Sequence, residues 1–150
     1  MSKGIVLGLL ILCGSLLVAC SGRGEAVVPK AEMIRCTAAY RASVAQSIER
    51  EESVTFTNSN AEKAVVFADM VFHAVYSDGE ADNERALRLW VTDGTDTAVY
   101  HTTLYQLPFD SGPQNQFVGG HGFTGLHYSY APDSSAELQF WCEAIASSRN

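Results

Sequence analysis

Four histidines are the side chains of this sequence best suited to chemistry, because imidazole can act as a general base or as a metal ligand. They are His73, His101, His121 and His127. None of their spacings matches those of a zincin or a zinc finger. His73 and His101 lie inside strand-like runs, so we expect them to be hydrogen-bonded structural residues. His121 and His127, with a nearby carboxylate, are the pair that could hold zinc.

Two further motifs resemble ligand sites without meeting their requirements. The acidic run 78–84 alternates carboxylates as a calcium loop does, but an EF-hand needs glycine in place of Asn83 and glutamate in place of Leu89. We therefore expect an exposed acidic loop. The run 120–125 has the form G-x-G-x-x-G, but a β-periodic segment follows it instead of a phosphate-binding helix. The chain also lacks G-x-S-x-G, and we predict no cofactor, no metal and no catalytic residue.

One long segment without periodicity is the candidate for ligand binding. Residues 109–123 combine proline and glycine with amides and aromatic rings. Long irregular connections in compact domains tend to be functional, and glycines let backbone amides approach a ligand. The alternative is a packing role, in which Phe117 and Val118 close one end of the domain. The candidate ligand-binding residues are Asn115, Gln116, Phe117, His121 and Phe123.

The start of the chain has the pattern of an export signal. Lys3 supplies a positive charge, and the apolar run 5–19 is shorter than the roughly 20 residues that a membrane-spanning helix needs. The run ends in Leu17-Val18-Ala19-Cys20, which resembles the lipobox of bacterial lipoproteins. Cys13 does not fit this pattern, because the large Leu12 precedes it. An uncleaved short anchor, or ordinary secretory cleavage with an incidental cysteine, is the alternative.

The resemblance covers residues 1–21 and implies that Cys20 carries a lipid with its palmitate chains. Residues 1–19 are then a cleaved signal peptide, residues 20–31 a lipidated cysteine with a flexible tether, and residues 32–150 the domain. The family pattern implies an extracytoplasmic protein anchored to the cell membrane. In an organism with two membranes it implies the outer one, because Ser21 is not the aspartate that retains such proteins at the inner membrane.

The charge of the predicted mature chain limits its partners. Cleavage leaves 150 − 19 = 131 residues and removes only Lys3 among the charged groups, so 10 − 1 = 9 basic residues face 17 acidic ones, a balance of −8. This acidity argues against nucleic acid and against a bare anionic membrane surface as partners. We expect contact with the membrane through the lipid on Cys20, and a protein or a glycan as the ligand.

Two cysteines, Cys36 and Cys142, remain for the exported domain. Each falls on the apolar side of an alternating run, 34–42 and 136–144 respectively. Because exported proteins are in an oxidising compartment, we predict a disulfide that joins the first strand to the last. Two free buried thiols or an intermolecular pair are the alternatives.

The alternation continues between the cysteines and predicts an all-β fold. About seven short strands indicate a single antiparallel β-sandwich-like domain. The run 65–76 is apolar on one side and largely apolar on the other, where Asp69 and His73 interrupt it, so it is expected to form one central strand. Asp93-Gly94 is typical of a hairpin. Tyr40, Val44 and Ile48 have helical spacing, which leaves open a short helix after the first strand.

These features favour a lipid-anchored module that binds a ligand or has a structural role in the cell envelope, without catalysis. The basis for the binding role is analogy with other acidic sandwiches that have aromatic loops. The alternative function is that of a metal-dependent enzyme that uses the region of His121 and His127.

Overall fold

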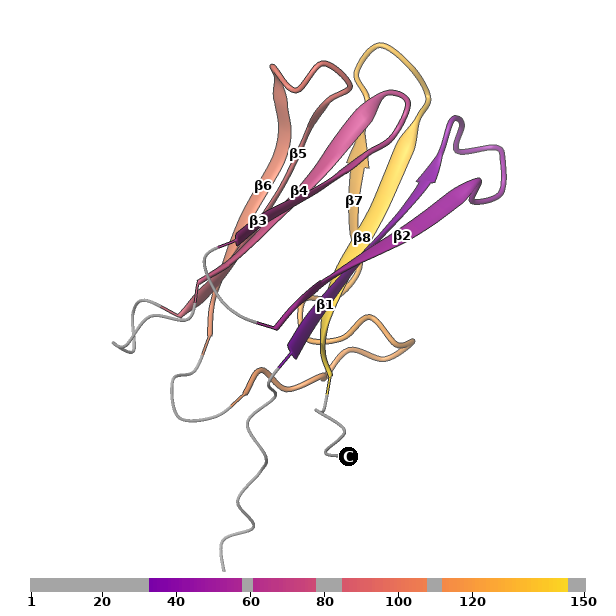
Figure 1. Ribbon diagram of the computed structural model, residues 1–150. Helices are drawn as coiled ribbons and strands as arrows, with labels where there is room; N and C mark the ends of the chain where they lie inside the picture. The colour runs from indigo at the N-terminus through magenta and orange to yellow at the C-terminus, as the bar shows by residue number, and fades with distance from the viewer. Residues whose placement is uncertain (1–32, 58–60, 78–84, 108–111, 146–150) are drawn as a thin grey trace, which may run out of the picture.

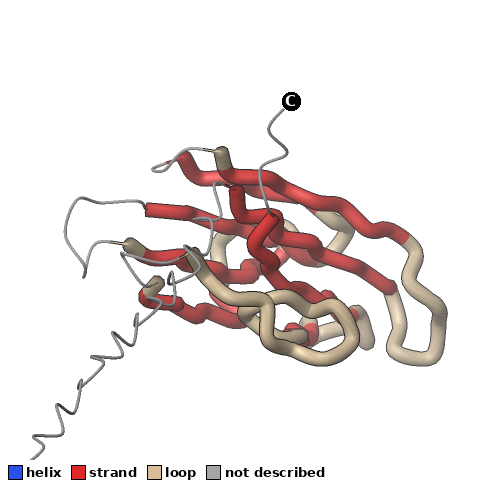
Figure 2. The backbone as a smooth tube through the Cα atoms, turned by 90° about the horizontal axis from the view of Figure 1, so that it is seen from below, coloured by secondary structure: helices blue, strands red, loops and turns tan. Residues whose placement is uncertain are grey.

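The computed structural model describes residues 33–57, 61–77, 85–107 and 112–145. These residues form eight strands in two antiparallel sheets of four, which face each other as a β-sandwich (Figure 1). The described chain contains no helix (Figure 2). The predicted all-β sandwich is therefore confirmed.

The predicted signal peptide, Cys20 and the tether lie outside the described residues. Within the described ranges, no helix has the length and hydropathy that crossing a membrane requires. The anchor remains a prediction from the sequence.

The two sheets differ in the order of their strands. The first has the order β2-β1-β8-β7, so the first and last strands of the domain lie side by side at its centre. Its strands are β1 (Met33–Arg41), β2 (Arg50–Phe56), β7 (His127–Tyr130) and β8 (Glu137–Ile145). The second sheet is a meander in chain order: β3 (Ala61–Val66), β4 (Met70–Ser77), β5 (Ala86–Asp93) and β6 (Val99–Gln106).

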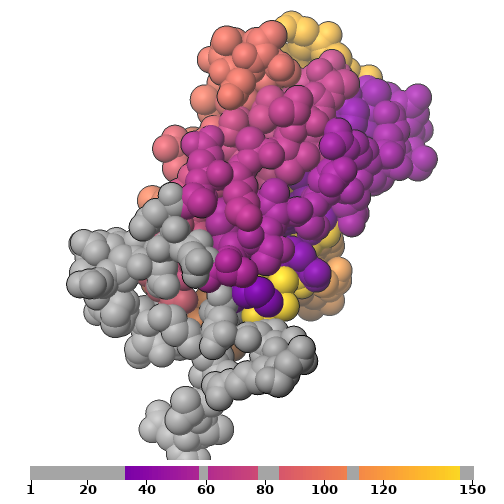
Figure 3. Space-filling view, viewed as in Figure 1, coloured from indigo at the N-terminus to yellow at the C-terminus, as the bar shows by residue number. Residues whose placement is uncertain are grey.

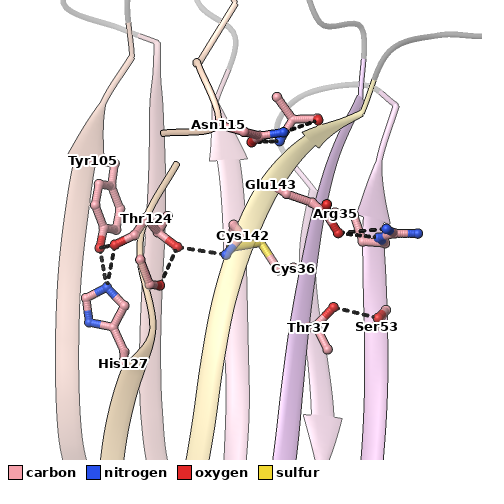
Figure 4. Close-up of a disulfide and its surroundings, with 12 residues drawn as sticks. Arg35, Cys36, Thr37, Ser53, Tyr105, Asn115, Thr124, His127, Cys142 and Glu143 are labelled. Carbon is pink, nitrogen blue, oxygen red and sulfur yellow. Dashed lines mark hydrogen bonds and ion pairs between the residues drawn. A yellow bond between two sulfur atoms is a disulfide. The ribbon is translucent and has the colours of Figure 1, made fainter. Parts of the chain in front are cut away.

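The pairing of β1 with β8 confirms the predicted disulfide. The register places Cys36 directly opposite Cys142, and the two residues are joined by a disulfide and fully buried (Figure 4). Both cysteines lie on the inner face, as the alternation indicated. The bridge fixes the central strand pair of the first sheet.

The core fills the space between the inner faces of the two sheets. Phe72 of β4 and Phe140 of β8, both fully buried, meet across this space with ring centroids 5.4 Å apart. Burying side chains of this size is the main favourable contribution to folding. The largest fully buried apolar side chains are Phe56, Phe72, Phe140, Ile34, Met70, Leu87, Leu89, Leu138 and Val91.

The structure has eight strands instead of about seven, because the run 65–76 is two strands and not one. The chain turns between β3 and β4, where the N–H of Phe67 donates to the carbonyl of Met70 at 2.8 Å. No glycine or proline marks this turn. The prediction of one central strand was wrong because the apolar alternation continues through the turn.

The short helix left open after the first strand is not formed. The chain bends at residues 42–46 and enters β2 at Arg50, and Val44 and Ile48 are 49% and 39% exposed. Their helical spacing therefore has no apolar surface to pack against. The hairpin predicted at Asp93-Gly94 is confirmed, since the N–H of Asp93 donates to the carbonyl of Ala98 at 2.9 Å.

Candidate functional site

The C-terminal half of β8 is paired with β1 on one side and with no strand on the other. β7 pairs with β8 only from Glu137 to Phe140, so the backbone groups beyond Phe140 on that side need other partners. The loop that precedes β7, residues 112–126, supplies them. We call this segment the docked loop.

The docked loop binds β8 through side chains as well as backbone. The side-chain amide of Asn115 donates to the carbonyl of Ala144 at 2.9 Å and accepts from its N–H at 2.8 Å (Figure 4). The N–H of Phe123 donates to the carbonyl of Cys142 at 3.0 Å. The N–H of Cys142 in turn donates to the hydroxyl oxygen of Thr124 at 2.7 Å. The loop thus replaces a strand along this edge.

Gly122 allows the docked loop to approach β8 closely. Its carbonyl accepts from the N–H groups of Gln116 and Phe117 at 3.0 and 3.1 Å, which closes a turn within the loop. Its φ is +62°, and a β-carbon at this position would lie 2.1 Å from the carbonyl oxygen of Cys142. Both the backbone conformation and the contact with β8 therefore require glycine.

We expect Gly122→Ala to undock the loop from β8. The added methyl group cannot coexist with the backbone of Cys142, so the loss should reach about 2–4 kcal/mol of unfolding free energy. Gly120→Ala is the matched control, because Gly120 also has a positive φ but has nothing within 4 Å of an added β-carbon. Thermal unfolding of the two variants measures the difference, and equal losses would show that the close approach is unimportant.

The docked loop and the C-terminal end of β6 border an open hollow of about 330 Å³. This volume lies at the low end of the range for small-molecule sites. The described lining contains three glutamines, two aromatic residues, a leucine and a proline, and none of these residues is charged. The residues are Tyr105, Gln106, Leu107, Pro113, Gln114, Gln116 and Phe123. We call this feature the amide-lined hollow.

Tyr105 is held in place at the wall of the amide-lined hollow. Its hydroxyl donates to the carbonyl of Thr124 at 3.2 Å and is also hydrogen-bonded to Nε2 of His127 (Figure 4). Burial raises the pKa of Tyr105 further above neutral pH. The ring also packs edge-on against Phe123, with centroids 6.3 Å apart.

Behind Tyr105, two histidines belong to the packing between the sheets. The ring of His127 stacks on Phe140, with centroids 5.2 Å apart. The ring of His101 packs edge-on against that of His127, with centroids 5.6 Å apart. Burial, and then the proximity of His127, lowers the pKa of His101, which favours its neutral form. These rings support Tyr105 from the core side.

The five predicted ligand-binding residues have different surroundings in the structure. Gln116 and Phe123 line the amide-lined hollow, although Phe123 is only 6% exposed. Asn115 is committed to β8, and Phe117 is half exposed with its ring against Gly125. His121 packs edge-on against Trp141 at 5.3 Å. The loop is therefore partly a packing element and partly the wall of a hollow.

His121 and His127 do not share a site. His121 contacts Trp141 and His127 stacks on Phe140, and these consecutive residues of β8 point to opposite faces of the sheet. Within the described ranges, no three histidine, cysteine, aspartate or glutamate residues are grouped as metal ligands.

His73 has the structural role expected of it. It is buried on the outer side of the second sheet and stacks on Trp90 at 4.7 Å. Its Nδ1 lies 3.1 Å from a carboxylate oxygen of Glu62, and its Nε2 lies 3.0 Å from one of Asp96. Both ring nitrogens are thus engaged within the fold.

A second hollow of about 400 Å³, near the β5–β6 turn, is rich in aspartate. Two of its three carboxylates, those of Asp93 and Asp69, already have partners within the fold. Hydrogen bonds from Thr95 and from the backbone of Ala98 and Thr97 lower the pKa of Asp93. Asp69 accepts from the hydroxyl of Tyr40 at 2.8 Å, and burial, followed by this bond, raises the pKa of Tyr40 to about 12. These interactions stabilise turns.

Comparison with known proteins gives no relative for this chain: no family model matches it, and no match was found among curated proteins or solved structures.

Proposed function

We propose that this protein is a lipid-anchored, extracytoplasmic binding module that holds an uncharged glycan in the amide-lined hollow. The location follows from the resemblance of residues 1–21 to a lipoprotein signal, with Cys20 as the lipidated residue. The hollow lies between β6 and the docked loop.

The observation that carries the ligand class is the neutrality of the described lining. The chain has 17 acidic and 10 basic residues, yet the seven described residues around the hollow carry no charge. Amide side chains both donate and accept hydrogen bonds, as sugar hydroxyls do, and aromatic rings pack against the apolar faces of sugars. A charged ligand would find no counter-charge among these residues.

The same lining favours binding over catalysis. Glutamine side chains do not titrate, and a tyrosine hydroxyl is protonated at neutral pH even before burial raises the pKa of Tyr105 further. General acid or base catalysis works best with a group whose pKa lies near the working pH. These groups are suited to recognition.

We expect the full chain, in detergent, to bind at least one neutral oligosaccharide from a panel built on N-acetylglucosamine, glucose and mannose. Gln116→Ala should weaken this binding about tenfold, because it removes one hydrogen-bonding side chain. The substitution leaves the backbone N–H that donates to Gly122 intact. Isothermal titration calorimetry measures the affinities.

Val118→Ala is the matched control for this experiment. Val118 belongs to the same loop but is 97% exposed and is not part of the lining. It should leave both the affinity and the melting temperature unchanged. Equal affinities of wild type and Gln116→Ala, or binding of neutral peptides but of none of the sugars, would contradict the proposal.

A further inference from the structure

The sandwich has four edge strands, and three of them carry features that prevent further pairing. The edges are β2 and β7 in the first sheet and β3 and β6 in the second. An unprotected edge pairs readily with another strand, and proteins block this with charges or with short strands. β2 carries Arg50, Glu51 and Glu52, β3 carries Glu62 and Lys63, and β7 has only four residues.

β6 is the edge strand that is neither charged nor short. A bulge at Tyr100 interrupts its pairing with β5 near one end, and residues 101–106 pair regularly. Its eight residues, VYHTTLYQ, include no proline, aspartate, glutamate, lysine or arginine. Two of its apolar side chains are largely exposed, Val99 at 60% and Leu104 at 67%. Within the described ranges, its backbone bonds only to β5. Among the described residues, none forms a backbone hydrogen bond with the other edge of β6.

The charged edge strands β2 and β3 lie on the side of the sandwich opposite to β6 and β7. They approach each other there, and the chain from β2 to β4 covers the face seen in the space-filling view (Figure 3). The uncharged edge of β6 is on the side where the two sheets end in β6 and β7 (Figure 1). Charge is thus distributed so that one long edge is left neutral.

We propose that two copies of this chain pair through β6 in an antiparallel arrangement. The two second sheets then join into one continuous sheet of eight strands about a two-fold axis, the commonest symmetry of dimers. This inference does not depend on the proposed glycan site.

The partner is inferred to be a second copy because two acidic chains can pair without repulsion at the neutral edge of β6. Each chain has a net charge of −7, so two copies repel each other wherever their acidic surfaces meet. β6 paired with itself brings no like charges opposite each other, whether the axis passes at Thr102 or at Thr103. A basic partner would instead be drawn to the acidic surfaces.

The test is the concentration dependence of the mass of the full chain in detergent, measured by analytical ultracentrifugation. Wild type should form dimers, and added salt should strengthen them because it screens the repulsion between two acidic copies. Leu104→Lys should raise the dimer dissociation constant about tenfold, because it places a charge on each of the two paired strands.

Val66→Lys is the matched control, since Val66 is a similarly exposed apolar residue, at 61%, on the opposite edge strand of the same sheet. It should leave the dissociation constant unchanged. Oxidation should give a covalent dimer of Thr102→Cys if the axis passes at residue 102, and of Thr103→Cys if it passes at residue 103. A wild type that stays monomeric at all soluble concentrations overturns the proposal, as does a dimer that Leu104→Lys and Val66→Lys affect equally.

Discussion

Replacement of Cys36 and Cys142 together by alanine should lower the free energy of unfolding by about 4–5 kcal/mol. The bridge closes a loop with a sequence separation of 106 residues, and its loss releases the conformational entropy of that loop in the unfolded chain. For a domain of this size, the melting temperature should fall by roughly 10–20 °C. Calorimetry with and without reducing agent measures the shift, and mass spectrometry without reduction should find the two peptides joined.

The single variants provide the internal control. Cys36→Ala already breaks the bond, so it should be almost as destabilising as the double variant, and the two single losses should not add. Additive losses, or alkylation of both thiols in the natively purified exported protein, would show that the bond is absent from the folded protein.

Cys20→Ala is expected to abolish attachment to the membrane. The predicted lipid supplies at least two acyl chains, each buried methylene contributes about 0.8 kcal/mol, and stable anchoring needs more than one chain. The variant should remain an unprocessed precursor or a soluble product, and labelled palmitate should not be incorporated. Fractionation and labelling in a bacterial host measure both.

Cys13→Ala is the matched control for the anchor, because Leu12 gives Cys13 the wrong preceding residue for the lipobox pattern. Its labelling should equal that of wild type. Equal labelling of wild type and Cys20→Ala would refute the assignment of Cys20.

The sandwich could be predicted because alternation with a period of two reports directly on burial in a strand. Cys36 and Cys142 are both fully buried, as their place in the apolar phase indicated. Alternation does not show where a strand ends, so the turn at Phe67 cannot be predicted from it. It also fails where the environment is mixed: Tyr128 and Tyr130 of β7 are about half exposed, while Ser129 between them is buried.

The candidate site could be predicted only in part, because its walls come from segments that the sequence does not place together. The irregular composition of residues 109–123 indicated Gln116 and Phe123 as candidates, and both line the hollow. It did not lead to Tyr105, which reaches the hollow through the pairing of β6 and the docking of the loop. Asn115 looked like a ligand contact because its amide can bind a substrate as readily as a backbone, and only the geometry shows that it binds Ala144.

The position of the disulfide also determines how the domain would transmit mechanical force. Cys36 lies three residues into β1 and Cys142 three residues before the end of β8, directly opposite each other. A pull applied ahead of Met33 and behind Ile145 therefore passes through the sulfur–sulfur bond. The chain between the two cysteines carries almost none of this tension, so the core of the sandwich should keep its shape under load. Ala144, to which Asn115 of the docked loop is bonded, lies beyond Cys142 and stays on the path of the tension. The domain would act as a short, nearly inextensible link.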